Sequence, residues 1–211
     1  ELKQLKKVKN KPLIYFSLKI FIKTRFFDKI LLVYPVKEKN LFQKFLKKSR
    51  FNHHIDLIPG GIERSDSVKK SILYIDSILK NNQKDHIVFI HDCARPLVKK
   101  SYINEMFKNL KHYPAVSLGY KITDALKLVN QKKEMIKDVD RDHLWAVTTP
   151  QAFHFDLLFS LINFNHQNFK YDETSLFLSE NYPAKILDLG RYNIKITYPE
   201  DWKIFKKLLG E

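Results

Sequence analysis

The residues best suited to chemistry follow an apolar run, in the segment His91-Asp92-Cys93-Ala94-Arg95-Pro96. Asp92 could hold a divalent metal ion or a hydroxyl group, because hard cations prefer carboxylate oxygens as ligands. Arg95 could bind a phosphate, since its planar guanidinium matches the geometry of phosphate oxygens. A structural ion pair between Asp92 and Arg95 is the competing interpretation.

A second candidate site is the turn Gly60-Gly61 with the residues that follow it, Ile62-Glu63-Arg64-Ser65-Asp66-Ser67. Glycines let a ligand approach the backbone closely, and the N–H groups of such turns form concavities that bind anions. Arg64 and Ser67 add side-chain donors. An ordinary glycine turn before a capped helix would explain the same residues.

Two further clusters place a cation beside turn residues. Arg141 closes a hairpin pattern, and Thr149 follows it in a Thr-Thr-Pro-Gln run. Arg141 could clamp a phosphate, and a surface ion pair with Asp140 is the alternative. Lys195 lies among apolar neighbours in the segment 191–197, which we interpret as a short strand. Lys195 would be either an edge residue of this strand or a phosphate ligand. None of these clusters is diagnostic alone.

Composition weighs against several other classes of function. The chain carries 38 Lys and Arg against 23 Asp and Glu, a formal charge of +15 that favours a polyanionic partner. Only six of the 38 are arginine, and the other 38 − 6 = 32 lysines are scattered along the chain. We therefore predict a solvated lysine-rich surface and no nucleic-acid partner.

The single cysteine, Cys93, excludes an intrachain disulfide, and we expect it to be a packing residue. The eight histidines show no zinc-ligand spacing, which favours surface or turn roles for them. Neither a signal peptide nor a run of about 18 apolar residues is present, so we expect a cytoplasmic protein with no membrane partner. The length fits one domain, residues 1–211.

The elements that must position these residues alternate between apolar runs and helical periodicities, which is typical of an α/β fold with a largely parallel sheet. We expect strands over 29–35, 54–59, 86–91, 116–120 and 185–189. We expect helices over 13–24, 38–49, 67–81, 100–112, 155–164, 172–180 and 199–209, with Ser65 or Asp66 capping the third. Because ligands bind at the carboxyl ends of strands in open α/β sheets, Asp92 and Arg95 should face the cleft.

The pattern changes between residues 122 and 141, where two apolar runs, 125–129 and 135–139, flank a polar turn. This pattern predicts a projecting β-hairpin arm. Such an arm has little core of its own. We therefore expect it to pack on a second subunit and to form a homodimer.

In order and spacing, the motifs resemble the family of 2-C-methyl-D-erythritol 4-phosphate cytidylyltransferases over residues 3–209. The matching motifs are Gly-Gly-x-Glu-Arg-x-Asp-Ser (60–67), His-Asp-x-Ala-Arg-Pro (91–96), Asp-Arg (140–141), Thr-Pro-Gln (149–151) and Asn-Ile-Lys-Ile-Thr (193–197). The resemblance implies a Rossmann-like nucleotidyltransferase sheet with flanking helices and a β-hairpin dimerisation arm. It also implies that a sugar-alcohol phosphate attacks the α-phosphorus of CTP in line, releasing pyrophosphate and forming a CDP-linked alcohol for non-mevalonate isoprenoid synthesis.

The resemblance also implies roles for individual residues. Lys3 would bind the triphosphate and stabilise the transition state, and Lys195 would take part in catalysis and hold the sugar-alcohol phosphate. The nucleotide would be bound by Gly61, Arg64, Ser67 and Asp92, and the sugar-alcohol phosphate also by Arg95, Arg141 and Thr149. Asp92 would be the ligand of Mg²⁺, the expected cofactor, and Arg141 would reach into the neighbouring subunit's pocket.

Two departures from the family pattern affect this interpretation. Relatives begin with a strand in the middle of the sheet and a Gly-rich loop of Ala-Ala-Gly-x-Gly-x-Arg type, ahead of a Lys-Gln pair that matches Lys3 and Gln4. We interpret the chain as N-terminally truncated relative to the family rather than as a natural loop-less variant. Relatives also read Asp-Thr where this chain reads Asp124-Ala125, which removes a hydroxyl that touches the substrate.

Three other functions remain open at this point. A ribitol 5-phosphate cytidylyltransferase would share the fold and the nucleotide motifs. A basic module could bind nucleotide or RNA without catalysis, as an inactive paralogue. A fragment could also dimerise through the hairpin alone.

Overall fold

The computed structural model describes residues 2–49, 51, 55–80, 84–164, 171–188 and 190–210. Three ends of predicted elements, His54, Asn81 and Leu189, lie outside the described residues. The larger strands are β3 (Ile30–Tyr34), β4 (Ile55–Pro59), β5 (Ile87–Ile90), β6 (Ala115–Lys121), β9 (Trp145–His154) and β10 (Ala184–Asp188). The α-helices are α1 (Leu13–Thr24), α2 (Lys39–Ser49), α3 (Arg64–Leu79), α4 (Lys100–Asn109), α5 (Phe155–Phe164), α6 (Thr174–Ser179) and α7 (Pro199–Leu208).

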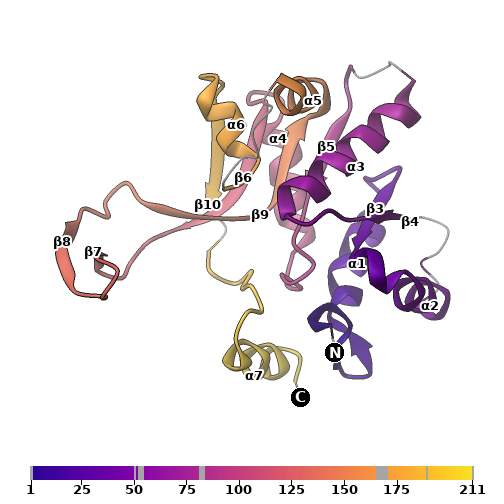
Figure 1. Cartoon of the computed structure of the whole chain (residues 1–211), viewed down its shortest axis with the longest axis horizontal. Coiled ribbons are helices and arrows are strands. Elements are labelled where there is room, and N and C mark those ends of the chain that lie inside the picture. The colour runs from indigo at the N-terminus through magenta and orange to yellow at the C-terminus, as the bar shows by residue number, and fades with distance from the viewer. Residues whose placement is uncertain are drawn as a thin grey trace.

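Shorter elements complete the chain. The 3-10 helices η1 (Lys3–Leu5) and η2 (Val36–Glu38) precede α1 and α2, and β1 (Lys7–Val8) pairs with β2 (Lys11–Pro12). The strands β7 (Leu126–Val129) and β8 (Met135–Val139) form the projecting hairpin arm. Figure 1 shows this arm extending away from the sheets and helices.

The main sheet has the strand order β10-β6-β9-β5 and is mixed. β10 is parallel to β6, whereas β9 is antiparallel to both β6 and β5. The prediction of a largely parallel sheet was therefore wrong for this half of the molecule. The arm is the reason: the chain leaves along β6, turns through the arm, and returns along β9 beside β6, as a hairpin must.

β9 is a strand that the sequence patterns did not predict. It runs through the Thr-Thr-Pro-Gln segment, and it is buried from Thr148 to Phe153 between β6 and β5. The Thr148 hydroxyl is satisfied inside the sheet, since it donates to the Leu118 carbonyl over 3.2 Å, whereas Oε1 of the buried Gln151 has no hydrogen-bond partner among the described residues. The Ser117 hydroxyl donates to the Thr148 carbonyl over 3.0 Å.

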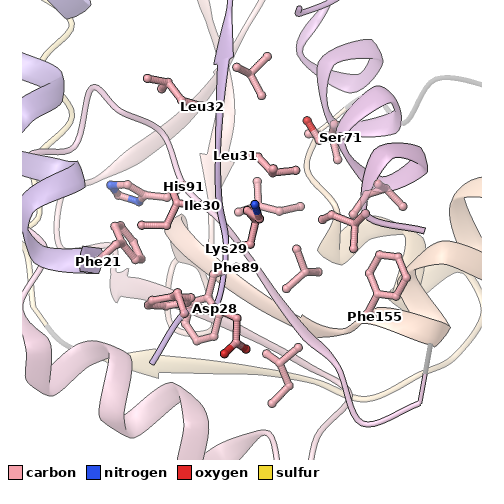
Figure 2. Close-up of a pocket in the computed structure, with 18 of the residues that line it drawn as sticks. Phe21, Asp28, Lys29, Ile30, Leu31, Leu32, Ser71, Phe89, His91 and Phe155 are labelled. Carbon is pink, nitrogen blue, oxygen red and sulfur yellow. The ribbon is translucent and has the colours of Figure 1, made fainter. Parts of the chain in front are cut away.

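β3 and β4 form a separate two-stranded parallel sheet. Among the described residues, β3 pairs only with β4 and β5 pairs only with β9, so the facing edges of β3 and β5 are not hydrogen-bonded to each other. A cavity of about 810 Å³ is lined by both strands and by residues of α1, α3 and α5. Figure 2 shows Leu31 and Leu32 in this cavity, with Phe21 and His91 on one side and Ser71 and Phe155 on the other.

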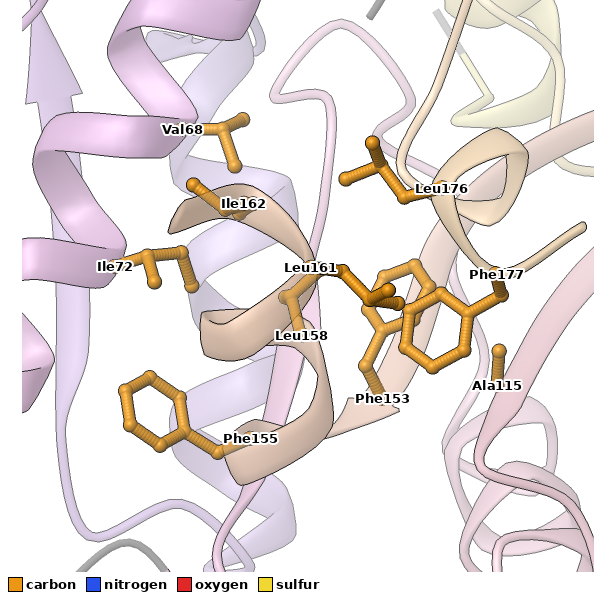
Figure 3. Close-up of a cluster of buried hydrophobic side chains, with 10 residues drawn as sticks. All are labelled: Val68, Ile72, Ala115, Phe153, Phe155, Leu158, Leu161, Ile162, Leu176 and Phe177. Atoms are coloured by element: carbon orange, nitrogen blue, oxygen red, sulfur yellow. The ribbon is translucent and has the colours of Figure 1, made fainter. Parts of the chain in front are cut away.

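The largest buried cluster joins α3, α5 and α6 to the main sheet (Figure 3). Its fully buried members include Phe153 and Phe177, whose rings stack with centroids 5.2 Å apart. Replacing either ring with alanine would cost about 3–5 kcal/mol, because a cavity would remain. This packing holds α6 and the start of α3 rigidly beside the end of β5, where the candidate site lies.

Candidate functional site

Asp92 lies two residues after the end of β5 and is surrounded by three cationic side chains. Its Oδ2 atom is 2.9 Å from Nζ of Lys195 and 3.9 Å from Nε of Arg95, and its Oδ1 atom is 3.8 Å from Nε of Arg64. Its side chain is 22% exposed, so it is accessible from the cleft. The structure thus brings together residues from three of the four predicted clusters, at the strand end where Asp92 and Arg95 were expected.

The charge state of Asp92 follows from these neighbours. Burial acts to raise the pKa of its carboxyl, but the hydrogen bond and charge of Lys195 and the charge of Arg64 outweigh burial and hold the pKa below 3.8. Asp92 is therefore an anion at neutral pH. The arrangement combines one carboxylate with three cations, which is a net positive pocket suited to phosphate groups.

Lys195 is not in a strand, contrary to the prediction. The segment from Ile194 to Thr197 has no strand assignment and no ladder partners, and the Ile196 N–H donates to the Ala94 carbonyl over 2.8 Å. Because Ile196 is fully buried, it anchors the segment and leaves the neighbouring Lys195 side chain 47% exposed at Asp92.

The glycine turn leads directly into α3, which begins at Arg64 and not at Ser67. Glu63 is the N-cap, and its N–H donates to Oδ2 of Asp66, so the expected cap at Ser65 or Asp66 was wrong. Asp66 is instead at position N3 of the helix, where its side chain completes a capping box with Glu63. Arg64 and Ser67 therefore lie on the first turn of a helix, whose N–H groups favour anions.

Gly61 is tightly enclosed at this turn. A Cβ atom there would lie 2.1 Å from Cβ of Asp66, so no larger residue fits without moving the helix start. The Gly61 N–H donates to the Ser67 hydroxyl oxygen over 3.0 Å, and that hydroxyl lies 3.2 Å from the Glu63 carbonyl that accepts it. The predicted nucleotide contacts Gly61 and Ser67 thus lie side by side.

Arg64 has a partner that the sequence patterns did not indicate. Its two terminal nitrogens donate to the two carboxylate oxygens of Glu173, each over 2.7 Å, and the Glu173 side chain is 0% exposed. Burial acts to raise the pKa of Glu173, whereas the charge of Arg64 acts to lower it, and the balance is a pKa above 4.5. The pair spans 109 positions in the sequence, which no local pattern could reveal.

Thr149 lies behind Asp92 in a chain of hydrogen bonds. Its hydroxyl oxygen accepts from the Asp92 N–H over 3.0 Å and lies 3.2 Å from Nδ1 of His91. Nε2 of His91 lies 3.0 Å from the Arg95 carbonyl, which can only accept, so Nε2 carries the ring proton and Nδ1 accepts from Thr149. In this arrangement the Thr149 hydroxyl proton is engaged within the protein.

His91 lies in the loop after β5 and is only partly exposed, which fits the turn role expected for it and not the surface role. Its ring lies 5.2 Å from that of Phe21, and burial lowers its pKa to about 4. The ring is therefore neutral at physiological pH, as its hydrogen bonds require. It shapes the loop after β5 rather than contributing charge to the site.

Arg95 is held by the segment that also carries Lys195. One terminal nitrogen donates to the Asn193 carbonyl over 3.0 Å, and the Asn193 amide donates to the Thr149 carbonyl over 2.7 Å. Nε of Arg95 is buried without a hydrogen-bond partner, beyond its 3.9 Å approach to Asp92. The Asp92 carboxylate is therefore the nearest anionic group to this N–H.

Lys3 lies in η1, close enough for its charge to act on Cys93 together with that of Lys195. Burial raises the pKa of the Cys93 thiol to about 11, and Cys93 packs against the apolar cluster around α1. The expectation that Cys93 is a packing residue is confirmed. Lys3 thus acts on Cys93, the residue that follows Asp92 in the chain.

Arg141 is not brought to this cluster within the chain. It is exposed at the base of the arm, and its terminal nitrogen donates to the Thr123 carbonyl, not to Asp140. Arg191 reaches the same place, donating to the Thr123 hydroxyl over 2.7 Å. Both arginines therefore brace the arm where it leaves the main sheet.

Within the residues that the structure describes, no group of three His, Cys, Asp or Glu side chains could hold a metal ion by itself. Asp92 is nevertheless a fitting Mg²⁺ ligand, because Mg²⁺ commonly takes one or two carboxylates together with substrate phosphates. No helix in the described part of the chain combines the length and apolar character needed to cross a membrane.

The family model for 2-C-methyl-D-erythritol 4-phosphate cytidylyltransferase matches residues 1–211 of the chain. The chain belongs to this family. A cytidylyltransferase of this name from Alkaliphilus oremlandii is 32% identical over 216 residues, which cover 98% of this chain and 86% of the relative.

Solved structures agree with the cytidylyltransferase fold. The 4-diphosphocytidyl-2C-methyl-D-erythritol synthase from Anaerococcus prevotii is 22% identical with a TM-score of 0.84, covering 99% of this chain and 93% of that one. The 2-C-methyl-D-erythritol 4-phosphate cytidylyltransferase from Francisella tularensis is 26% identical with a TM-score of 0.81, covering 98% and 93%. The predicted α/β nucleotidyltransferase fold is confirmed.

Proposed function

We propose that this chain transfers the cytidylyl group of CTP to 2-C-methyl-D-erythritol 4-phosphate, giving CDP-methylerythritol and pyrophosphate in non-mevalonate isoprenoid synthesis, in the cytoplasm. The observation that carries the proposal is Asp92 at the end of β5 within reach of Lys195, Arg95 and Arg64. Membership of the family supplies the substrates.

The protein contributes to this reaction mainly by positioning the substrates and neutralising their charge, and less by covalent catalysis. An oxygen of the alcohol phosphate forms a bond to the α-phosphorus of CTP, and the bond from that phosphorus to the bridging oxygen of pyrophosphate breaks. Both reactants are polyanions that repel each other. The cations around Asp92 offset this repulsion and hold the two groups in line.

The individual roles remain those that the resemblance implies. Lys195 and Arg95 hold the alcohol phosphate, Thr149 joins them by turning its hydroxyl proton away from Nδ1 of His91, and Lys3 binds the triphosphate. Gly61, Arg64 and Ser67 bind the nucleotide at the start of α3, where the first-turn N–H groups add to their effect. Asp92 would hold Mg²⁺, and the bound ion would neutralise part of the triphosphate charge.

A homodimer through the arm is part of this proposal. Val129 and Met135 are opposite each other in the hairpin and are 46% and 76% exposed. A two-stranded hairpin is marginally stable alone, so an apolar cross-strand pair on its surface favours packing on a second copy. Arg141, at the base of the arm, would then leave the Thr123 carbonyl and enter the partner's pocket.

The cavity between β3 and β5 bears on activity. The resemblance expects a strand in the middle of the sheet and a Gly-rich loop that cradles the triphosphate. A strand between β3 and β5 would find a backbone edge on each side, since the facing edges of both lack strand partners among the described residues. It would also cover the apolar side chains that line the cavity.

The decisive experiment is pyrophosphate release from CTP, Mg²⁺ and methylerythritol phosphate. It would compare the chain of residues 1–211 with the same chain extended ahead of residue 1 by an apolar strand and a Gly-rich loop. A Gly/Ser extension of equal length is the control. Activity with the strand and loop supports the proposal, and silence in every version rejects it. A faster reaction with ribitol 5-phosphate would indicate that ribitol 5-phosphate is the alcohol substrate. Ala125 leaves this choice of alcohol open.

A further inference from the structure

We propose that Glu173 is a positioning residue for cytidylyl transfer, acting through Arg64. It fixes the guanidinium so that the N–H groups not bonded to Glu173 face an anionic group of CTP beside Asp92. The inference rests on the proposed function and extends it to a residue outside the family motifs described above.

The first step is the geometry of the pair. Both carboxylate oxygens of Glu173 accept from the two terminal nitrogens of Arg64, at 2.7 Å each, which is a two-point fork that fixes the guanidinium plane. A guanidinium has five N–H donors, so three remain for other partners. One of the three is on Nε, which lies 3.8 Å from Oδ1 of Asp92.

The second step is the rigidity of Glu173 itself. It immediately precedes α6, and the preceding residue, Asp172, accepts the Thr174 N–H over 3.0 Å, fixing the turn. Leu176 and Phe177 of α6 are 2% and 0% exposed in the main core. Glu173 is therefore attached to a packed element, whereas Arg64 is 40% exposed at the cleft.

The third step is what would happen without the carboxylate. Glu173 is 0% exposed and cannot touch a ligand, so its effect must pass through Arg64. An arginine released from Glu173 would turn to Asp92, which already lies within ion-pair reach. It would then compete with Lys195 and with Mg²⁺ for that carboxylate. Glu173 thus keeps Arg64 available and Asp92 accessible.

The substitution Glu173→Gln tests the positioning directly, because it removes the charge and keeps the volume. In the unchanged chain, the guanidinium ¹⁵N–¹H signals of Arg64, assigned by their loss in Arg64→Lys, should be resolved and slow to exchange. In Glu173→Gln they should merge and exchange about ten-fold faster, as expected for loss of a charge-assisted hydrogen bond. Glu180→Gln, at the exposed end of α6, should leave them unchanged. Unaltered signals in Glu173→Gln would overturn the proposal.

Kinetics separate positioning from a general loss of structure. Glu173→Gln should raise the KM for CTP about ten-fold or more while changing kcat less, and Glu173→Asp should fall between it and the unchanged protein. In an Arg64→Ala background, adding Glu173→Gln should change kcat/KM by less than about two-fold. An equal effect of Glu173→Gln in both backgrounds would show a structural role only. If Glu173→Gln does not fold, two other variants still decide whether Glu173 acts through Arg64. These are Glu173→Asp and the double variant Arg64→Ala/Glu173→Gln, which leaves no unpaired arginine.

The two proposals fail separately. Absence of pyrophosphate release from every version of the chain would reject the proposed function. The guanidinium signals do not depend on turnover, and they alone decide whether Glu173 fixes Arg64. Unchanged signals in an active enzyme would reject the positioning role alone.

Discussion

Nζ of Lys195 lies 2.9 Å from Oδ2 of Asp92, which joins the C-terminal segment to the end of β5. The sequence motifs give the two side chains different tasks, a phosphate ligand and a metal ligand. In the structure each is the other's nearest charge partner. A phosphate that draws Lys195 away would free an Asp92 oxygen for a metal ion, so the two tasks are linked through this single contact.

The pKa of Asp92 should depend on Lys195. Because the hydrogen bond and charge of Lys195 lower this pKa, Lys195→Met should raise it, and a ¹³C titration of the Asp92 carboxyl would measure the change. Because the pKa of Asp92 is lower in the folded than in the unfolded chain, its ionised carboxyl stabilises the fold above about pH 4. This stabilisation is lost as the pH falls through the folded-state pKa. The acid destabilisation that Asp92 causes should therefore be weaker in Lys195→Met. An unchanged titration would mean that the pair is absent in solution.

Removing the phosphate-binding cations should affect the alcohol substrate most. Lys195→Ala and Arg95→Ala should each raise the KM for methylerythritol phosphate about ten- to a hundred-fold, since each loses a hydrogen bond to a charged group. Lys203→Ala, which removes an exposed lysine of α7, is the matched control. Steady-state kinetics with CTP in excess measure the effect. A normal KM in both variants would remove these residues from the phosphate site.

Lys3 should act on turnover rather than on substrate affinity. It lies in η1, where its charge acts on Cys93, and as a transition-state ligand it would stabilise charge that develops on the triphosphate. Lys3→Ala should lower kcat about 100-fold with little change in KM. Single-turnover measurements at saturating CTP would check this. Lys7→Ala, an exposed neighbour in β1, should have no such effect.

The buried ring of His91 should make stability depend on pH. Its folded pKa of about 4 lies below the ordinary value of 6.5, so the unfolded chain binds more protons between these values. The free energy of unfolding should therefore rise with pH from about 4 to 6.5 and then level off. Urea melts across this range should show a flatter profile in His91→Gln than in His143→Gln, which changes an exposed histidine. Equal profiles would contradict the assignment of a neutral ring.

Local patterns in the sequence were sufficient to predict helices that bury only one face. The helix predicted over 13–24 is α1 (Leu13–Thr24) itself, because its buried residues recur on one face. The helix predicted over 67–81 begins three residues earlier, at Arg64, because Glu63 and Asp66 satisfy the first N–H groups through the capping box. The spacing of apolar residues says nothing about such a polar first turn.

Elements that depend on distant partners were not predictable in the same way. β9 carries polar residues from Thr148 to Gln151, a composition that favours a loop, and it becomes a strand because β6 and β5 hydrogen-bond to both of its edges. Glu173 could not be predicted as a site residue for the same reason, since only folding places it against Arg64. The cations and Asp92 were found because their motifs stand at element boundaries.

The arm should control the oligomeric state if it packs on a second copy. Met135 and Ile136 are 76% and 59% exposed, and as consecutive strand residues they lie on opposite faces of the arm. Changing both to Asp should weaken a two-fold dimer at least about 100-fold, because each substitution occurs twice in the symmetric interface. Sedimentation equilibrium would show monomers, whereas Lys132→Asp at the polar turn should leave the dimer intact. A dimer that persists in the double variant, or an unchanged chain that is already monomeric, would show that the arm does not join two copies.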